Sequence, residues 1–194
     1  MTAHFPMLVP GATSDDGNLE VKAPYDGTLI ATVTAADSAA VETAHANASR
    51  LFKDRSQWLK PSQRIEILSK TADIMTGRAE ELAVESAREG GKPLTDSIVE
   101  VTRAINGVRS CIELLRTDSG EEIPMGLNAA SEGRVAFTRH EPIGVVVAVS
   151  AFNHPLNLIV HQTAPAVAVG CPVIVKPAED TPLSAWAFGV LARE

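Results

Sequence analysis

Two short polar segments follow directly after apolar runs near the end of the chain. Asn153 and His154 come after the run 143–151, and Lys176 ends the run that begins at residue 173. The Asn side chain offers amide hydrogen-bond donors, and the Lys side chain offers ammonium donors. If both runs are strands of one parallel sheet, these donors lie beyond the carboxyl ends of the strands, where α/β proteins collect their functional groups. Asn153 and Lys176 are therefore the first candidate site residues.

The sequence around these residues predicts a strand, a helix and a second strand. Residues 143–151 are almost all apolar, a run that is too short to span a membrane and typical of a strand buried on both faces. The amphipathic stretch 156–169 ends at Gly170, a residue suited to a left-handed helix end. The β-branched run 173–175 follows. This order predicts a βαβ unit with a right-handed crossover.

Several motifs occur here in the order and spacing of one enzyme superfamily. They are Glu141-Pro142-Ile143-Gly144-Val145-Val146, Phe152-Asn153-His154-Pro155, Ala164-Pro165-Ala166-Val167-Ala168-Val169-Gly170 and Lys176-Pro177-Ala178-Glu179-Asp180-Thr181-Pro182-Leu183-Ser184. The earlier Arg64-Ile65-Glu66-Ile67-Leu68, Glu89-Gly90-Gly91-Lys92-Pro93 and Glu100-Val101 extend the similarity. On these motifs the chain resembles the aldehyde dehydrogenase superfamily.

The resemblance implies an α/β fold, with a helical layer plus the first βαβ unit of a Rossmann-like doubly wound parallel sheet. It divides a truncated aldehyde dehydrogenase-like fold into an N-terminal β element and helices (1–118), a β-hairpin-like oligomerisation arm (119–140) and the incomplete βαβα start of the NAD-binding domain (141–194). The catalytic cysteine and general-base glutamate of the family lie downstream of the matched motifs. We therefore expect the isolated chain to be inactive.

The resemblance also implies roles for the residues at the two strand ends. Asn153 matches the oxyanion-hole asparagine of the family; the alternative is a turn residue favoured before Pro155. Lys176 and Glu179 match positions that hold the adenosine ribose of NAD, with Ala151 and Phe152 beside the same cofactor. A carboxylate at residue 179 favours NAD over NADP because it repels a 2′-phosphate. The alternative is a solvated charge pair.

A further set of polar residues is expected to line the aldehyde tunnel: Arg103, His154, Asn157 and His161. Arg103 matches an arginine of branches that act on phospho- or phosphono-aldehydes, and a guanidinium beside imidazoles suits a small anion. The pattern resembles phosphonoacetaldehyde, non-phosphorylating glyceraldehyde-3-phosphate and lactaldehyde dehydrogenases. The alternative is a solvent-facing Arg103 and a histidine that only supports its neighbours.

The N-terminal half predicts a small β element followed by helices. A turn at 25–28 separates two β-prone runs, and helical periodicity covers about 38–52, 61–77, 79–89 and 95–116. In the first of these helices, Val41, Ala44, Ala48 and Leu51 share the face expected to pack. Residues Ser119 to His140 are interpreted as the arm of a homodimer or homotetramer, with a plain surface loop as the alternative.

Composition excludes several classes of function. A net charge of −7 without a cluster of Lys and Arg argues against a nucleic-acid partner. The N-terminus carries no secretory signal, no membrane association is indicated, and a cytoplasmic location is expected. The two cysteines, Cys111 and Cys171, have no metal-ligand spacing and are interpreted as structural residues; no metal site is predicted.

The sequence therefore predicts NAD-dependent oxidation of an aldehyde to the carboxylate, through a cysteine thioester formed outside this chain, with a small anionic aldehyde as the candidate substrate. One alternative is a non-catalytic cofactor-binding or assembly module derived from such an enzyme. Another is a different Rossmann-type reductase. That reductase would carry a Gly-rich turn after the first strand, where Phe152-Asn153-His154-Pro155 stands instead.

Overall fold

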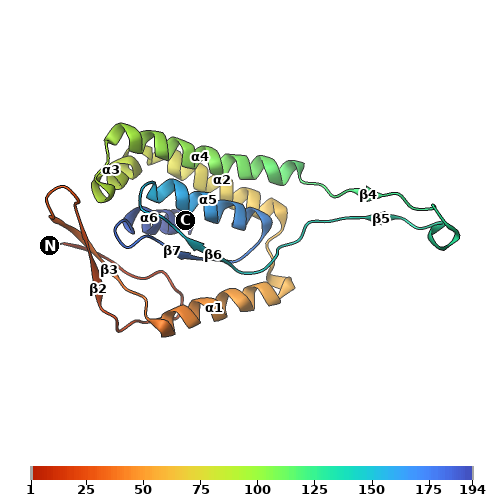
Figure 1. The fold of residues 1–194 in the computed structure, drawn as a ribbon, viewed down its shortest axis with the longest axis horizontal. Helices are drawn as coiled ribbons and strands as arrows, with labels where there is room; N and C mark the ends of the chain where they lie inside the picture. The colour runs from red at the N-terminus through yellow and green to blue at the C-terminus, as the bar shows by residue number, and fades with distance from the viewer. Residues whose placement is uncertain (1, 194) are drawn as a thin grey trace.

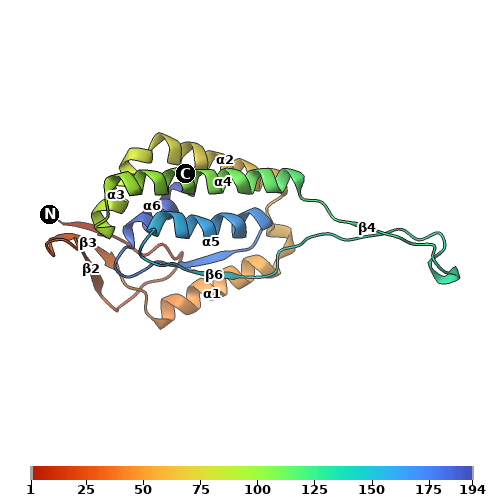
Figure 2. The same ribbon diagram turned by 45° about the horizontal axis from the view of Figure 1, so that its top comes forward.

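The computed structural model describes residues 2–193 and shows helices layered over a small parallel sheet. Figure 1 and Figure 2 show α2 and α4 lying over α5, which in turn lies over strands β6 and β7, with α1 beyond the sheet. A second sheet lies at the end where the N-terminus begins, and a long hairpin projects from the opposite end. The expected α/β architecture is confirmed.

The N-terminal sheet has the strand order β1-β3-β2. The predicted hairpin is present as β2 (Asn18–Lys22) antiparallel to β3 (Leu29–Thr34). Strand β1 (Ala3–Phe5), which pairs in parallel with Ala31 to Val33 of β3, was not predicted from the sequence. A three-residue strand carries too few alternating positions to be detected, and its partner lies far along the chain.

The C-terminal helix fastens this sheet to the rest of the molecule. Leu183, the first residue of α6 (Leu183–Leu191), packs into the core of the N-terminal sheet. Trp186 donates from Nε1 to the carbonyl oxygen of Pro6 at 2.8 Å, and its ring meets Phe5 edge to face with 4.7 Å between centroids. Arg193 donates to the carbonyl oxygen of Leu8 at 3.1 Å. Residues 5–8 are therefore in direct contact with residues 186 and 193.

The four predicted helices of the N-terminal half are confirmed, with a short 3-10 turn between the first two. They are α1 (Ser38–Lys53), α2 (Pro61–Gly77), α3 (Ala79–Gly90) and α4 (Leu94–Thr117), with η1 (Arg55–Gln57) after α1. Asp37 caps α1, because its Oδ1 accepts the N–H of Ala40 at 2.7 Å. The main core lies where α4 packs on α2, α3 and α5, around side chains such as Met75, Val108 and Ile159.

The expected packing face of α1 is wrong in part. Val41 and Leu51 are exposed, whereas Ala40 and Ala48 are buried. The helix contacts β7, and its buried residues are small alanines, whereas the larger Val41 and Leu51 lie at the surface. Ala48 of the predicted face is buried as expected, but the buried stripe includes Ala40 in place of Val41 and Leu51.

The βαβ unit consists of β6 (Val146–Val149), α5 (Pro155–Val169) and β7 (Val173–Lys176), and its two strands are parallel. Gly170 ends α5 with φ of 88°, the left-handed conformation that favours glycine. The expectation that the first strand is buried on both faces is wrong for this chain. Ala148 is buried on the α5 side, but Val147 and Val149 on the other face are each 61% exposed. Within residues 2–193, α5 packs against the face of β6 that carries Ala148 and leaves the face with Val147 and Val149 open.

The arm at 119–140 is a hairpin in which β4 (Glu122–Ile123) pairs antiparallel with β5 (Ala136–Phe137), with η2 (Ala129–Ser131) at its tip. It extends away from the helical layer (Figure 1). At its base, Nδ1 of His140 lies 2.9 Å from Oδ1 of Asp118. Leu127, Val135 and Phe137 are 74–82% exposed, so the arm carries apolar side chains that no other part of residues 2–193 covers.

No helix within residues 2–193 is both long enough and apolar enough to cross a membrane.

Candidate functional site

The carboxyl ends of β6 and β7 lie side by side, because Val149 pairs with Lys176 in the parallel register. The segment Ala151 to Asn153 follows β6 and is exposed, as is Lys176 at the end of β7. Asn153 immediately precedes the cap residue of α5 and therefore lies at the N-terminal, electropositive end of that helix. The structure thus brings the predicted oxyanion donor and the predicted cofactor residues to one edge of the sheet.

A buried carboxylate caps the helix that follows Asn153. Oε1 of Glu100 accepts the backbone N–H groups of Leu156 at 2.8 Å and of Asn157 at 3.0 Å. Its Oε2 accepts the hydroxyl of Ser86 at 3.0 Å and pairs with Nζ of Lys92. These bonds satisfy the first N–H groups of α5, which have no partner within the helix. Glu100 therefore fixes the start of α5 to α3 and α4.

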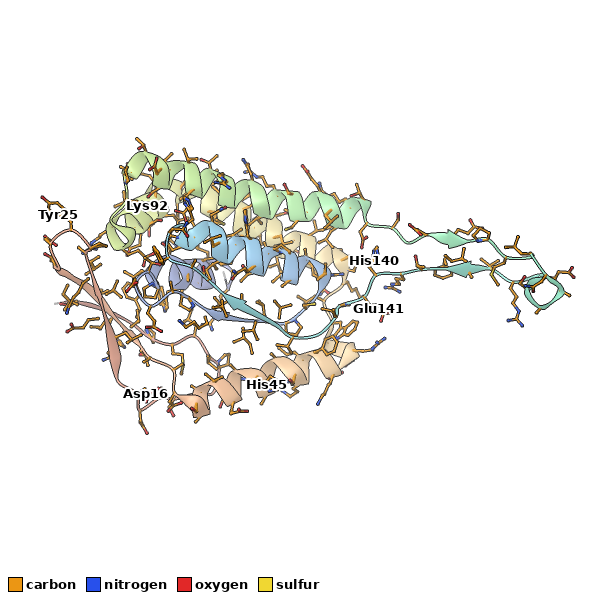
Figure 3. The ribbon with its side chains drawn as sticks, in the orientation of Figure 1. Asp16, Tyr25, His45, Lys92, His140 and Glu141 are labelled. Carbon is orange, nitrogen blue, oxygen red and sulfur yellow. The ribbon has the colours of Figure 1, made fainter. Side chains whose placement is uncertain are left out.

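Lys92 connects this carboxylate to the strand-end segment. Its Nζ also donates to the carbonyl oxygen of Asn153 at 3.3 Å. Lys92 follows Gly91, which has a left-handed φ of 63°. A Cβ at residue 91 would also lie only 3.0 Å from the ring of Pro24, so glycine is favoured there for two reasons. Figure 3 shows Lys92 beside the start of α5, at the end of the molecule opposite the arm. The tight turn after α3 thus delivers the ammonium group to Asn153.

A second buried glutamate caps the helix that follows Lys176. The carboxylate of Glu89, at the end of α3, accepts the N–H groups of Leu183 at 2.7 Å and Ser184 at 2.8 Å. Its side chain is fully buried. Burial raises the pKa of Glu89 from 4.5 to about 7, while the hydrogen bonds from Ser184 and Leu183 act in the opposite direction. The loops that follow β6 and β7 are therefore each held by a buried carboxylate of the helical layer, Glu100 for the first and Glu89 for the second.

The raised pKa of Glu89 predicts a pH-dependent stability. Folded protein binds this proton more tightly than unfolded protein, so the contribution is fully present below about pH 4.5 and is lost as the pH rises through about 7. The shift of the Glu89 pKa between the unfolded and the folded chain corresponds to about 3 kcal/mol of unfolding free energy. Between about pH 5 and about pH 8, wild type should lose about 2–3 kcal/mol more unfolding free energy than Glu89→Gln, measured by urea unfolding.

The matched control is Glu80→Gln, which changes an exposed glutamate of the same helix. That variant should keep the pH dependence of wild type. Equal pH profiles for wild type and Glu89→Gln would show that Glu89 titrates normally in the folded chain.

The predicted cofactor residues form an open pair. Nζ of Lys176 lies 3.3 Å from Oε1 of Glu179, and the two side chains are 55% and 73% exposed. A pair this exposed contributes little to stability, so its donors and acceptors remain available to a ligand. An ammonium and a carboxylate directed to solvent beyond a strand end fit the hydroxyls of a ribose.

The predicted tunnel residues separate into two groups. Arg103 and His161 are exposed on α4 and α5, and the His161 ring lies against Gly107, one helical turn from Arg103. His154 is partly exposed, with Nδ1 3.7 Å from Oε2 of Glu100. Asn157 is only 3% exposed, which places it in the interior rather than on the face that carries Arg103. Its position at the first turn of α5, bonded to Glu100, explains that burial.

Both cysteines are buried, as the sequence indicated. Burial raises the pKa of the Cys111 thiol, which makes it a poor nucleophile. Cys171 lies before β7, at the amino end of the strand. Within residues 2–193, no three His, Cys, Asp or Glu side chains gather as they would around a metal ion.

Comparison with known proteins agrees with this geometry. The sequence model of the aldehyde dehydrogenase family matches residues 12–194. The chain belongs to the aldehyde dehydrogenase family. It is 37% identical over 176 residues to a 3-sulfolactaldehyde dehydrogenase of Priestia aryabhattai, covering 91% of this chain and 36% of that protein. The aldehyde dehydrogenase chain thus spans about a third of the length of this relative.

Solved structures show the same family fold. Aldehyde dehydrogenase 21 from Physcomitrella patens, in complex with the reaction product succinate, superposes with a TM-score of 0.92 at 32% identity, covering all of this chain and 40% of that one. Glyceraldehyde-3-phosphate dehydrogenase GapN from Methanocaldococcus jannaschii, complexed with NADP, gives a TM-score of 0.84 at 29% identity and covers 93% and 38%.

The sequence analysis did not assign a role to the two buried glutamates or to Lys92 of this aldehyde dehydrogenase chain. A signal was present for Glu100, which falls on the same helical face as Ala104 and Val108 of the buried stripe. Glu89 likewise follows Leu82 and Ser86 on the buried face of α3. A carboxylate on an apolar stripe requires several partners, so such a position predicts a capping or pairing role.

Proposed function

We propose that residues 1–194 form the oxyanion-binding and cofactor-binding start of an enzyme that oxidises an aldehyde to a carboxylate with NAD, through a cysteine thioester. The observation that carries the proposal is the strand register, which places the loop of Asn153 beside the loop of Lys176 and Glu179. Both local cysteines are buried, so the nucleophile and the general base would come from sequence outside these residues.

In the proposed reaction, each local group has a defined task. The Asn153 side-chain amide would donate a hydrogen bond to the carbonyl oxygen of the aldehyde, which gains negative charge when a thiolate attacks the carbon. The N-terminal end of α5 adds positive potential at the same place. Lys176 and Glu179 would hold the ribose hydroxyls of the cofactor. Bound NAD would accept the hydride that leaves the substrate carbon.

Glu179 supports NAD as the cofactor. Its exposed carboxylate stands where it would repel the additional phosphate of NADP. GapN from Methanocaldococcus jannaschii was crystallised with NADP, so relatives of this fold accept that cofactor. The preference for NAD in this chain therefore rests on residue 179 and is a proposal.

Arg103 and His161 support a small anionic aldehyde as the substrate. Their exposed positions on neighbouring helices offer a guanidinium and an imidazole to one anionic group. A related protein of Priestia aryabhattai is named 3-sulfolactaldehyde dehydrogenase, after an aldehyde that carries a sulfonate. Substrate charge is thus the property that we propose these residues recognise.

The proposed function is tested by assaying the purified full-length protein for aldehyde-dependent formation of reduced cofactor, with NAD and NADP compared at equal concentration. We expect turnover with NAD and a lower kcat/KM with NADP. Calorimetry with NAD would be run on the same sample. Binding of NAD without turnover on any aldehyde would indicate a non-catalytic module instead, and a preference for NADP would contradict the role of Glu179.

The arm supports assembly into a homodimer or homotetramer, because exposed apolar side chains on a projecting hairpin suit a second copy of the chain. Gly120 is required at its base, since a Cβ there would overlap the carbonyl oxygen of Thr138. Gly120→Ala should therefore disturb the hairpin and shift the full-length protein toward monomer, measured by analytical ultracentrifugation.

The control for this prediction is Gly77→Ala, where a Cβ meets no atom within 4 Å. That variant should assemble as wild type does. An unchanged oligomer in Gly120→Ala would argue that the arm takes no part in assembly.

A further inference from the structure

The loop that carries Asn153 is held on both sides by one ion pair. Lys92 donates to the carbonyl oxygen of Asn153 itself, and Glu100 accepts the N–H groups of Leu156 and Asn157 just beyond it. We infer that Lys92 and Glu100 are positioning residues that fix Asn153 as the oxyanion donor. This inference rests on the proposed function, and it extends the site to two residues of the helical layer.

Burial makes the pair rigid. The Glu100 side chain is 0% exposed and the Lys92 side chain only 14%. The carboxylate receives donors from two backbone amides, the Ser86 hydroxyl and the Lys92 ammonium. A buried carboxylate is tolerated when it is satisfied in this way, and its geometry is then tightly determined. The turn between β6 and α5 is therefore held in a fixed position relative to α3 and α4.

Glu89 provides an internal comparison. It caps α6 through two backbone amides in the same manner that Glu100 caps α5. Among residues 2–193, however, Glu89 forms no ion pair with a Lys or Arg that reaches back to the preceding loop. Only the cap of α5 therefore combines helix anchoring with a direct contact to a residue of the proposed chemistry.

A merely structural role and a positioning role predict different results when combined with loss of Asn153. A structural pair lowers kcat by the same factor whether or not Asn153 is present. A pair that acts through Asn153 has nothing left to position once the amide is removed, so the second loss disappears. The interaction between the substitutions is therefore the decisive measurement.

The experiment uses the full-length enzyme and the double variant Lys92→Met/Glu100→Gln, which leaves no unpaired buried charge and keeps an amide oxygen for the α5 N–H groups. With Asn153 present, the double variant should lower kcat by about tenfold to a hundredfold. With Asn153→Ala added, the same double variant should lower kcat further by less than about twofold. The Kd for NAD should stay unchanged in every variant, since Lys176 and Glu179 are untouched.

Glu89→Gln is the matched control, and its effect on kcat should be the same with and without Asn153→Ala. Multiplicative effects of Lys92→Met/Glu100→Gln and Asn153→Ala would overturn the positioning inference while leaving the proposed function standing. If the double variant fails to fold, the charge-retaining variants Lys92→Arg and Glu100→Asp repeat the cycle, because each changes the geometry of the ion pair without leaving a buried charge unpaired. A normal kcat in Asn153→Ala alone would instead remove the proposed role of Asn153 and the inference with it.

Discussion

Replacing Asn153 by alanine in the full-length enzyme is expected to lower kcat by about a hundredfold to a thousandfold. The amide would contribute most when the substrate oxygen carries negative charge, so its removal should affect the chemical step rather than the binding of NAD. The exposed position of Asn153, ahead of α5, leaves its side chain free to reach a substrate. Steady-state kinetics with saturating aldehyde and a separate NAD titration check this result.

Asn18→Ala is the matched control for this substitution, because Asn18 is an exposed asparagine on β2, in the other sheet. It should leave kcat within about twofold of wild type. If Asn153→Ala raised only the KM for NAD and left kcat unchanged, Asn153 would be a cofactor contact and not an oxyanion donor.

Arg103→Leu should lower kcat/KM for an anionic aldehyde by about tenfold to a hundredfold, because a charge-assisted hydrogen bond contributes about 1.5–3 kcal/mol. A neutral aldehyde of similar size should lose little. The comparison of the two substrates isolates charge recognition from any general effect on the fold. Kinetic measurements on the full-length variant with both aldehydes provide the test.

Arg109→Leu serves as the control for charge at this helix. Arg109 is exposed on α4 and donates to the hydroxyl of Thr76, at the side of α2. Its replacement should not change the preference between anionic and neutral aldehydes. The anionic-substrate proposal is wrong if Arg103→Leu reduces kcat/KM for both substrates by the same factor.

Sequence patterns correctly predicted the elements that are determined by residues close together in the sequence. The apolar period of α2 and the Gly170 stop after α5 are of this kind, and so is the βαβ order that places Asn153 and Lys176 at one edge. Strand β1 was missed because it exists only through pairing with β3. The sequence pattern also could not show that Val147 would remain exposed, since burial of a strand face depends on what packs against it.

The candidate site was predicted less completely than the fold. Motif resemblance selected residues that would face the ligands, such as Asn153 and Glu179, but not the buried residues that hold their loops. Glu100 and Lys92 contribute through hydrogen bonds to backbone atoms of a distant segment. Any residue type offers the same backbone N–H and carbonyl groups, so the sequence of the bound segment does not show that it is bound. These partners are therefore seen only in the three-dimensional structure.

The contact between the two ends of the chain has a consequence for biosynthesis. Trp186 of α6 donates to Pro6 across 180 residues of sequence, and Leu183 completes the core of the N-terminal sheet. A ribosome releases β1, β2 and β3 first, yet Leu183 and Trp186 can reach these strands only after α6 has emerged. Contacts of such long sequence separation form slowly, and strands that wait for them expose apolar surface. The core of the N-terminal sheet therefore stays incomplete until residues 183–186 have been translated.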